Sequence, residues 1–217
     1  MEITWYGHSC FRLTQRRMTT IVTDPYDGAA VGLPPLKLKA DVVTISTDAP
    51  GHNALKAVKG ARHVLTGPGE YEIGGVFITA IHTNGKGKSQ GELPRNTLFL
   101  FDYDGITVAH LGNMRRVPTQ AEVEALGTVH VALVPVGGGS ALSAAKAAEV
   151  ISVLEPSIVV PMHYRLPGTT SKLESVTRFL KEMGVEGAAP VPVLKVTRAS
   201  IPDELQVVVL ENANAPS

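Results

Sequence analysis

The sequence predicts an α/β domain in which layered β-sheets are covered by helices on the outside. Two patterns lead to this prediction. The first half of the chain consists of short apolar runs separated by Gly, Pro, Asn and Asp, as in strands joined by tight turns. The second half alternates apolar runs with amphipathic helical patterns, which favours parallel strands with helices packed against them. We expect one domain over residues 1–211 and a frayed tail over 212–217.

The first half of the chain is expected to be almost entirely strand and turn. Strands are predicted at residues 2–6, 10–14, 19–23, 42–46, 63–66, 71–73 and 76–82. Two further strands, 97–103 and 106–110, flank Asp104-Gly105, a dipeptide that favours a tight hairpin turn. Between them and the earlier strands, the Gly- and Lys-rich residues 84–91 are expected to form a surface loop.

Three helices are expected in the second half, each marked by a residue that caps its first turn. Thr119 and Glu122 have the spacing of a capping box at the start of a helix over 118–126. Ser143 is suited to cap a helix over 144–154. Ser171, with Glu174 three residues later, predicts a third helix over 172–183.

The strands between these helices are predicted from their continuous apolar character. The runs 129–136 and 157–161 are almost wholly apolar, as expected of strands covered on both faces. We expect both to share one sheet with the strand 42–46, so that the carboxyl ends of all three converge on one edge. Closing strands are predicted at 193–196 and 206–210.

Composition excludes several classes of protein. Lys and Arg together number 20 and so do Asp and Glu, a balance that argues against a nucleic-acid-binding protein. The single cysteine, Cys10, excludes an internal disulfide. The N-terminal residues lack the pattern of a secretory signal, and no apolar run is long enough to cross a membrane. We therefore expect a cytoplasmic protein without nucleic-acid or membrane partners.

Several segments together resemble a known family. They are WYGHSCFRL, VTDPYDG, ADVVTISTDAPGHN, GPGEYEIGG, VALVPVGGG and EPSIVVPMHY, in this order over residues 5–164. This series resembles the metallo-β-lactamase-fold hydrolases, in particular the branch of L-ascorbate-6-phosphate lactonase-like proteins. The resemblance implies an αββα four-layer sandwich, with the site at one edge between the two sheets.

The resemblance also implies where metal ligands should lie, and most of those positions have changed. Members of the superfamily usually carry His-x-His-x-Asp-His after the strand that here ends in the segment Ile45-Ser46. The corresponding ligand positions are Thr47, Ala49, Gly51 and His52, so that one imidazole remains.

Two of the remaining ligand positions can be assigned and one is left open. The bridging aspartate of the family falls on Asn113, whereas the last histidine is kept as His163. The last ligand position falls on Gly85, or on His82 after a local shift of the alignment. His8 and Asp24 match positions that orient ligands. For Asp24 we favour the simpler interpretation that its side chain caps the Asp24-Pro25 turn.

These changes predict that the two-metal centre of the family is lost. Both carboxylates that would offset the charge of two cations are absent, and uncompensated buried charge is costly. We expect no metal. The alternative is one zinc or manganese ion on His52 and His163, with His8 or His82 as the candidates for a further ligand. Since Arg115 and Arg116 lie two and three residues after the Asn113 position, a small anionic ligand is the expected occupant.

Three hypotheses for function follow, and whether the protein is an enzyme is left open among them. The first is a protein of this fold that has lost its metals, a pseudoenzyme that binds a small anion. The second is an active hydrolase of lactones or phosphoesters with an unusual single-metal site. The third is a structural protein, possibly a homo-oligomer, in which the old pocket is closed.

Overall fold

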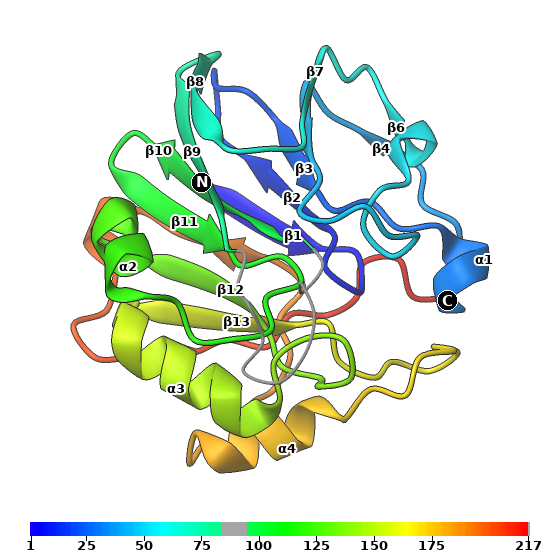
Figure 1. Ribbon diagram of the computed structural model, residues 1–217, viewed down its shortest axis with the longest axis vertical. Helices are drawn as coiled ribbons and strands as arrows, with labels where there is room; N and C mark the ends of the chain where they lie inside the picture. The colour runs from blue at the N-terminus through cyan, green and yellow to red at the C-terminus, as the bar shows by residue number, and fades with distance from the viewer. Residues whose placement is uncertain (84–94, 217) are drawn as a thin grey trace.

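Two mixed β-sheets lie face to face in the computed structural model, with helices and loops on their outer faces (Figure 1). The structure describes residues 1–83 and 95–216, so that the surface loop expected at 84–91 and the ligand position at Gly85 lie outside the described residues. Two central sheets with helices and loops outside them form the layered sandwich that the family resemblance implies.

The first sheet has six strands and contains the N-terminal part of the chain. Its order is β14-β1-β2-β3-β5-β7, antiparallel from β14 to β3 and parallel from β3 to β7. The strands are β14 (Leu194–Lys195), β1 (Glu2–Trp5), β2 (Phe11–Thr14), β3 (Ile21–Thr23), β5 (Val42–Thr44) and β7 (His63–Leu65).

The second sheet has seven strands in the order β15-β13-β12-β11-β10-β9-β8. They are β15 (Gln206–Val207), β13 (Ile158–Met162), β12 (Val131–Pro135), β11 (Ile106–His110), β10 (Thr97–Tyr103), β9 (Val76–His82) and β8 (Gly69–Ile73). The β10–β11 hairpin turns at Asp104 and Gly105, whose φ values of 54° and 81° are those that the predicted turn requires. Strands β12 and β13 are buried along their whole length, as their apolar runs predict.

Helices cover the second sheet, whereas the outer face of the first is covered mainly by loops. Helix α2 (Gln120–Leu126) has the predicted capping box, and α3 (Ala144–Leu154) is capped by Ser143 and packs against β12. Helix α4 (Val176–Glu182) packs on α3. The layer over the first sheet consists of α1 (Gly28–Val31), the 3-10 helix η1 (Leu55–Ala57) and the small sheet β4–β6 (Leu38–Lys39 and Val58–Lys59). A second 3-10 helix, η2, spans Arg198–Ser200. In the part of the chain that the structure describes, no helix is long and apolar enough to cross a bilayer.

The core divides along the same lines. The larger cluster fills the space between the sheets and beneath α3, and includes Trp5, Phe11, Phe99 and Phe101, each at most 1% exposed. The smaller cluster packs the loop layer on the first sheet around Tyr26 and Leu36. Strands β3, β5, β12 and β13 are buried at every residue, so that they are covered on both faces and hold the loops at the shared edge in place.

Three expectations are corrected by the structure. Strand β5 pairs with β3 and β7 in the first sheet, not with β12 and β13. The prediction was wrong because a continuous apolar run shows that a strand is covered on both faces but does not show which sheet contains it. The third helix begins at Val176 rather than at residue 172, since Glu174 bonds through its backbone to Gly137 and Arg165 instead of to a helical turn.

The tail is the third correction, because residues 212–216 are held by hydrogen bonds rather than frayed. The amide of Ala213 donates to the carbonyl of Trp5 at 2.9 Å. The side-chain amide of Asn214 donates to the hydroxyl of Tyr26 and to the carbonyl of Pro34, each at 2.9 Å. These hydrogen bonds therefore hold the tail next to the turn between β1 and β2.

Candidate metal site

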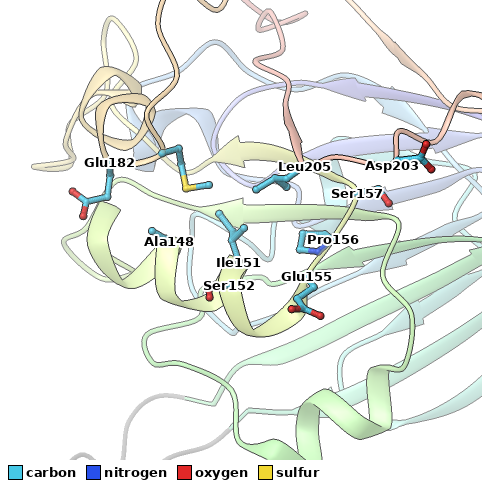
Figure 2. A pocket seen from close by; sticks show the side chains of 10 residues that line it. Ala148, Ile151, Ser152, Glu155, Pro156, Ser157, Glu182, Asp203 and Leu205 are labelled. Atoms are coloured by element: carbon cyan, nitrogen blue, oxygen red, sulfur yellow. The ribbon is translucent and has the colours of Figure 1, made fainter.

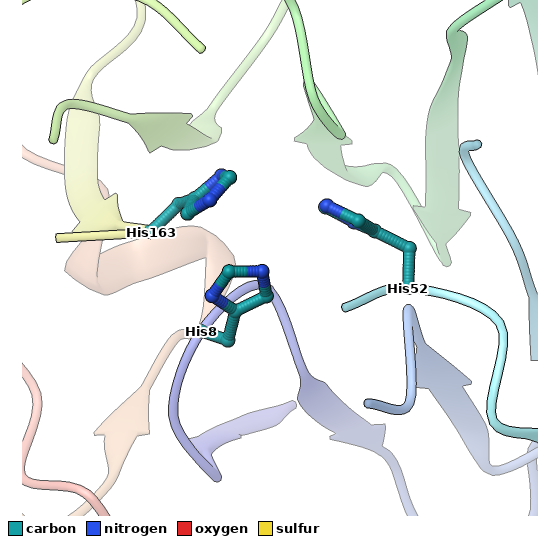
Figure 3. A group of neighbouring side chains, drawn as sticks. All are labelled: His8, His52 and His163. Atoms are coloured by element: carbon teal, nitrogen blue, oxygen red, sulfur yellow. The ribbon is translucent and has the colours of Figure 1, made fainter. Parts of the chain in front are cut away.

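Three histidines from distant parts of the chain meet at one edge of the sandwich (Figure 3). His8 lies in the turn between β1 and β2, His52 in the turn that follows β5, and His163 directly after β13. One ring nitrogen of each lies within 4.8 Å of the others, and all three side chains are buried. We call His8, His52 and His163 the histidine cluster. It combines ligands from both sheets, as the shared edge allows.

The backbone at this edge is held in an unusual conformation. His8, Asp24 and His163 have φ values of 51°, 39° and 53°, in the left-handed region that residues other than glycine seldom adopt. The turn of His8 is fixed by its carbonyl, which accepts from the amide of His163 at 2.9 Å and from the indole of Trp5 at 3.0 Å. Strained residues of this kind, each costing about 1–3 kcal/mol, gather at functional sites.

A buried carboxylate orients one imidazole of the cluster. Oδ2 of Asp24 lies 2.7 Å from Nδ1 of His52, and the same carboxylate accepts from the amide of Ser46 at 2.7 Å and from its hydroxyl at 2.6 Å. Nδ1 of His52 therefore carries the proton, which leaves Nε2 with a lone pair. A histidine that donates to a carboxylate through one nitrogen is typical of metal ligands. The interpretation of Asp24 as a turn cap is thus corrected.

Burial keeps the imidazoles of His8 and His163 neutral. It lowers the pKa of His8 to about 3, with positive charge on His52 acting in the same direction and Asp24 opposing it. Burial, and then positive charge on His8, His52 and Arg115, lowers the pKa of His163 well below its ordinary value. For Asp24, burial would raise the pKa, but His52, His110 and Ser46 together outweigh it and the pKa is lowered. Neutral imidazoles beside an ionised carboxylate are suited to a cation.

The donor set fits a divalent metal ion. Three imidazoles are the protein ligands of one well-known kind of catalytic zinc site, which leaves a fourth position for water or substrate. Nδ1 of His163 is buried and has no hydrogen-bond partner among the described residues. Unpaired buried nitrogens are rare because they lose hydration without compensation, so that a ligand for this group is expected.

His8 occupies the space in which the family resemblance would place an aspartate side chain. A Cβ atom on Gly51 would lie 2.6 Å from Nε2 of His8, too close for any side chain. Thr47 and Ala49 lie in the same tight turn, in which the amide of His52 donates to the carbonyl of Ala49 at 2.8 Å. The imidazole of His8 therefore leaves room only for glycine at position 51.

Asn113 lies at the same edge but on the other sheet. Its amide donates to the side chain of Asn96 at 2.7 Å, and a Cβ atom on the neighbouring Gly112 would lie 2.4 Å from Cβ of Ser46. The turn of Asn113 thus packs directly on the residue that holds Asp24. The side-chain oxygen of Asn113 is buried and without a hydrogen-bond partner in the described part of the chain.

The other predicted site residues lie outside the histidine cluster. Nδ1 of His82 lies 3.1 Å from the hydroxyl of Thr97, so that His8, not His82, joins His52 and His163. Arg115 acts on the pKa of His163 and so lies toward the cluster. The prediction that Arg116 holds an anion is corrected, because its guanidinium already forms a bidentate pair with Glu122 at 2.7 and 2.6 Å.

Sequence reasoning missed Ser46 and Asn96, which hold the site together from opposite sheets. Ser46 binds Asp24 and also accepts, through its carbonyl, from the amide of Thr97 at 2.7 Å. Asn96 donates to the carbonyl of Leu111 at 3.1 Å. The feature of the sequence that could have indicated them is their position at the ends of predicted strands. A serine or asparagine is common at a strand end, however, and does not by itself indicate a site.

A separate cavity of about 520 Å³ lies between α3, α4 and the segment before β15 (Figure 2). It is lined by Glu155, Pro156 and Ser157, which precede β13, whereas His163 follows that strand. This cavity is therefore at the opposite end of β13 from the histidine cluster and takes no part in the site.

Comparison with known proteins identifies the family. A β-lactamase superfamily domain matches residues 2–163. A UPF0173 protein of Pyrococcus furiosus is 31% identical over 84% of this chain and 90% of its own length. The crystal structure of a metallo-β-lactamase superfamily protein from Thermotoga maritima is 36% identical, with a TM-score of 0.78 over 96% of this chain and 97% of that one. The chain belongs to the metallo-β-lactamase superfamily and, within it, to the UPF0173 family.

A more distant structure agrees in fold alone. It is Igni18, a metallo hydrolase from Ignicoccus hospitalis, with 20% identity and a TM-score of 0.67 over 90% of this chain and 99% of that chain. The agreement at this low identity shows that the two-sheet architecture is kept while the side chains differ.

Proposed function

We propose that this protein is a metal-dependent hydrolase with a single-metal centre formed by His8, His52 and His163. The observation that carries the proposal is the convergence of three buried ring nitrogens within 4.8 Å of one another. Relatives support the class of activity: the protein of Koribacter versatilis that is 22% identical over 88% of this chain is named a UPF0173 metal-dependent hydrolase. The Thermotoga maritima relative is described as a candidate zinc-dependent hydrolase.

The residues of this chain prepare the centre in three ways. Asp24 fixes the tautomer and the ring orientation of His52. The hydrogen bonds at the carbonyl of His8 fix the turn that carries its imidazole. Burial keeps the imidazoles of His8 and His163 neutral and excludes bulk water. A divalent ion bound there would supply Lewis-acid chemistry toward a carbonyl or phosphoryl oxygen.

One ion is proposed rather than two because the second set of ligands is absent at the positions that the family uses. Thr47, Ala49, Gly51 and Asn113 offer neither an imidazole nor a carboxylate. The buried carboxylate of Asp24 is already bonded to Ser46 and His52. A second cation would therefore lack both ligands and charge compensation.

The competing proposal is an anion-binding protein without metal. It would require His52 and His163 to be protonated, with Arg115 adding charge at the rim. Burial and mutual repulsion among the imidazoles oppose that state, since both lower the pKa of His163. The geometry therefore supports a cation more directly than an anion.

Metal analysis tests the proposal. Full-length protein is stripped with chelator, reloaded separately with zinc, manganese or iron(II), desalted and measured by elemental analysis. We expect close to one ion per chain, lost in His8→Ala and His163→Ala. His63→Ala is the matched control, because His63 is an exposed imidazole on β7. The loaded protein is then assayed with aryl esters, lactones and aryl phosphoesters, with the stripped protein as reference.

The outcomes separate the three functional hypotheses. One ion per chain together with metal-dependent hydrolysis supports the proposal. Binding of none of the three metals would overturn it and favour the anion-binding protein, which phosphate titration would then detect. One ion without hydrolysis of any substrate class would contradict the enzymatic part and favour a structural role for the site.

A further inference from the structure

A cavity of about 670 Å³ lies between α1 and η1, and the ring of Tyr26, which lines it, packs against His8 of the histidine cluster. We propose that this cavity binds the apolar acyl or aryl group of the substrate, so that the protein prefers esters or lactones with a bulky apolar substituent. This inference rests on the proposed function for the reaction, but the cavity itself is a binding site that can be tested without metal.

The walls of the cavity are mainly apolar. The apolar side chains that line it are Pro35, Leu36, Pro50, Ala54, Leu55 and Ala57. Its volume lies within the range of about 300–1,000 Å³ that is usual for small-molecule pockets, and it is too small for a folded partner. Leu55 remains 38% exposed, which leaves apolar surface at the edge that a ligand would cover.

Tyr26 connects the cavity to the histidine cluster. Its side chain lines the cavity, and its ring lies edge-on to the ring of His8 with 6.4 Å between centroids. On a second wall, Asn53 and Pro50 line the cavity and flank the segment that carries His52. A ligand in the cavity is thus separated from the imidazole of His8 by the ring of Tyr26, and its second wall contains residues that flank His52 in the chain.

The wall formed by Tyr26 is fixed in place. Its hydroxyl donates to the carbonyl of Tyr6 at 2.8 Å and accepts from the side chain of Asn214 at 2.9 Å. Burial raises the pKa of Tyr26 to about 12, so the hydroxyl stays protonated and keeps donating. A rigid wall defines the shape of the cavity, and shape selects among apolar groups.

The two charged residues that line the cavity are of opposite sign, Asp27 and Lys56. The carboxylate of Asp27 accepts from the amide of Ala29 at 3.0 Å and caps α1. Because the two charges offset one another, the apolar part of a ligand is expected to dominate its affinity.

Binding of hexanoate to the stripped, metal-free full chain tests the inference, with acetate and hexylammonium as comparison ligands. Titration calorimetry or ligand-observed NMR gives the affinities. Because hexanoate can bury four further methylenes, we expect it to bind at least about tenfold more tightly than acetate. Hexylammonium has a hexyl chain and the opposite charge, and we expect its affinity to differ less from that of hexanoate than the affinity of acetate does.

Variants locate the binding. Ala54→Phe fills the cavity and is expected to weaken hexanoate binding by at least about tenfold. Ala148→Phe is the matched control, because Ala148 lines the remote cavity shown in Figure 2. Leu55→Gln, at a partly exposed position, is a second variant that does not depend on fitting a larger side chain into the interior. Circular dichroism and thermal melting verify that each variant is folded.

Two results would overturn the inference: hexanoate binding no more tightly than acetate, or Ala54→Phe and Leu55→Gln both leaving hexanoate affinity unchanged. Its failure is distinguishable from failure of the proposed function, which concerns metal stoichiometry. In the zinc-loaded protein, the inference further expects kcat/KM for p-nitrophenyl hexanoate to exceed that for p-nitrophenyl acetate. Ala54→Phe should remove this preference, and a preference that survives in both cavity variants would contradict the assignment.

Discussion

Nδ1 of His52 lies 2.7 Å from Oδ2 of Asp24, and both side chains are almost wholly buried. This pair joins the first sheet to the histidine cluster, since the same carboxylate accepts two hydrogen bonds from Ser46 at the end of β5. The contact fixes which nitrogen of His52 carries the proton. It therefore decides whether the imidazole presents a lone pair to a metal ion.

Replacing Asp24 with Asn should weaken zinc binding by about 10–100-fold, the usual effect of losing a residue that orients a metal ligand. The neutral amide attracts the N–H of His52 less strongly, and its NH2 group cannot accept the hydrogen bonds that one carboxylate oxygen accepts from Ser46 or His52. Zinc affinity is measured by competition with a chelator. Asp48→Asn is the control, because Asp48 is exposed and accepts only from Asn53 among the hydrogen bonds found for it. Equal zinc affinity in wild type and Asp24→Asn would contradict this role.

Introducing the family aspartate at position 51 should damage the site rather than restore it. A Cβ atom on Gly51 would lie 2.6 Å from Nε2 of His8, so that Gly51→Asp must displace the imidazole. We expect a loss of about 1–3 kcal/mol in the free energy of unfolding, as for other overpacked interiors. Zinc stoichiometry should also fall. Urea unfolding and elemental analysis measure the two effects.

Gly67→Asp provides the matched control for this substitution, since nothing lies within 4 Å of a Cβ atom at Gly67. The control should retain both stability and zinc. A Gly51→Asp protein that bound two ions per chain would show that His8 can move aside, and the assignment of His8 as a ligand would then be wrong.

The pair of Arg116 and Glu122 should stabilise the protein in a pH-dependent manner. Burial would raise the pKa of Glu122, but Arg116 and Thr119 outweigh it and the pKa is lowered. A depressed carboxyl pKa adds stability above the pKa of the unfolded chain, near 4.3, and this stability is lost as pH falls through the folded pKa.

Glu122→Gln should therefore cost about 1–2 kcal/mol in the free energy of unfolding at pH 7, a value set by partial exposure of the pair. The difference from wild type should shrink toward zero at pH 3. Urea denaturation at the two pH values measures this difference in the free energy of unfolding. Glu124→Gln, two residues further along α2, is the reference. A difference that stays constant between the two pH values would refute the ionic origin of the effect.

The C-terminal tail should support the turn that carries His8. Asn214 donates to the hydroxyl of Tyr26, which in turn donates to the carbonyl of Tyr6, two residues before His8. Asn214→Ala leaves the carbonyl of Pro34 without its donor and frees Tyr26, at an expected cost of about 1–3 kcal/mol in the free energy of unfolding. Zinc affinity should fall as well, by a few fold.

Glu211→Ala tests whether the effect is specific to Asn214, because Glu211 is an exposed residue directly before the tail. Thermal unfolding of the stripped protein and chelator competition are measured for both variants. If Asn214→Ala changed stability but left zinc affinity at the wild-type value, the tail would stabilise the fold without positioning His8.

Features that depend on neighbouring residues were predictable from the sequence. Helices α2 and α3 begin and end close to the predicted residues because Thr119, Glu122 and Ser143 make their capping hydrogen bonds within one turn. The β10–β11 hairpin follows from Asp104-Gly105, whose backbone conformation is a local property. Where a cap pattern had a stronger distant partner, as for Glu174, the prediction of a helix start was wrong.

The sequence by itself determined the superfamily, most strands and helices, and the absence of an imidazole or carboxylate at Thr47, Ala49 and Asn113, because each depends on residue identity and short spacing. Only the tertiary structure decided that His8 meets His52 and His163, that Asp24 orients the cluster, and that Arg116 is engaged by Glu122. These contacts join residues far apart in the chain or settle which of several partners a charged group takes. They form when the two sheets close on one another, and the position of each side chain at that edge is set by the packing of both sheets rather than by its neighbours in sequence.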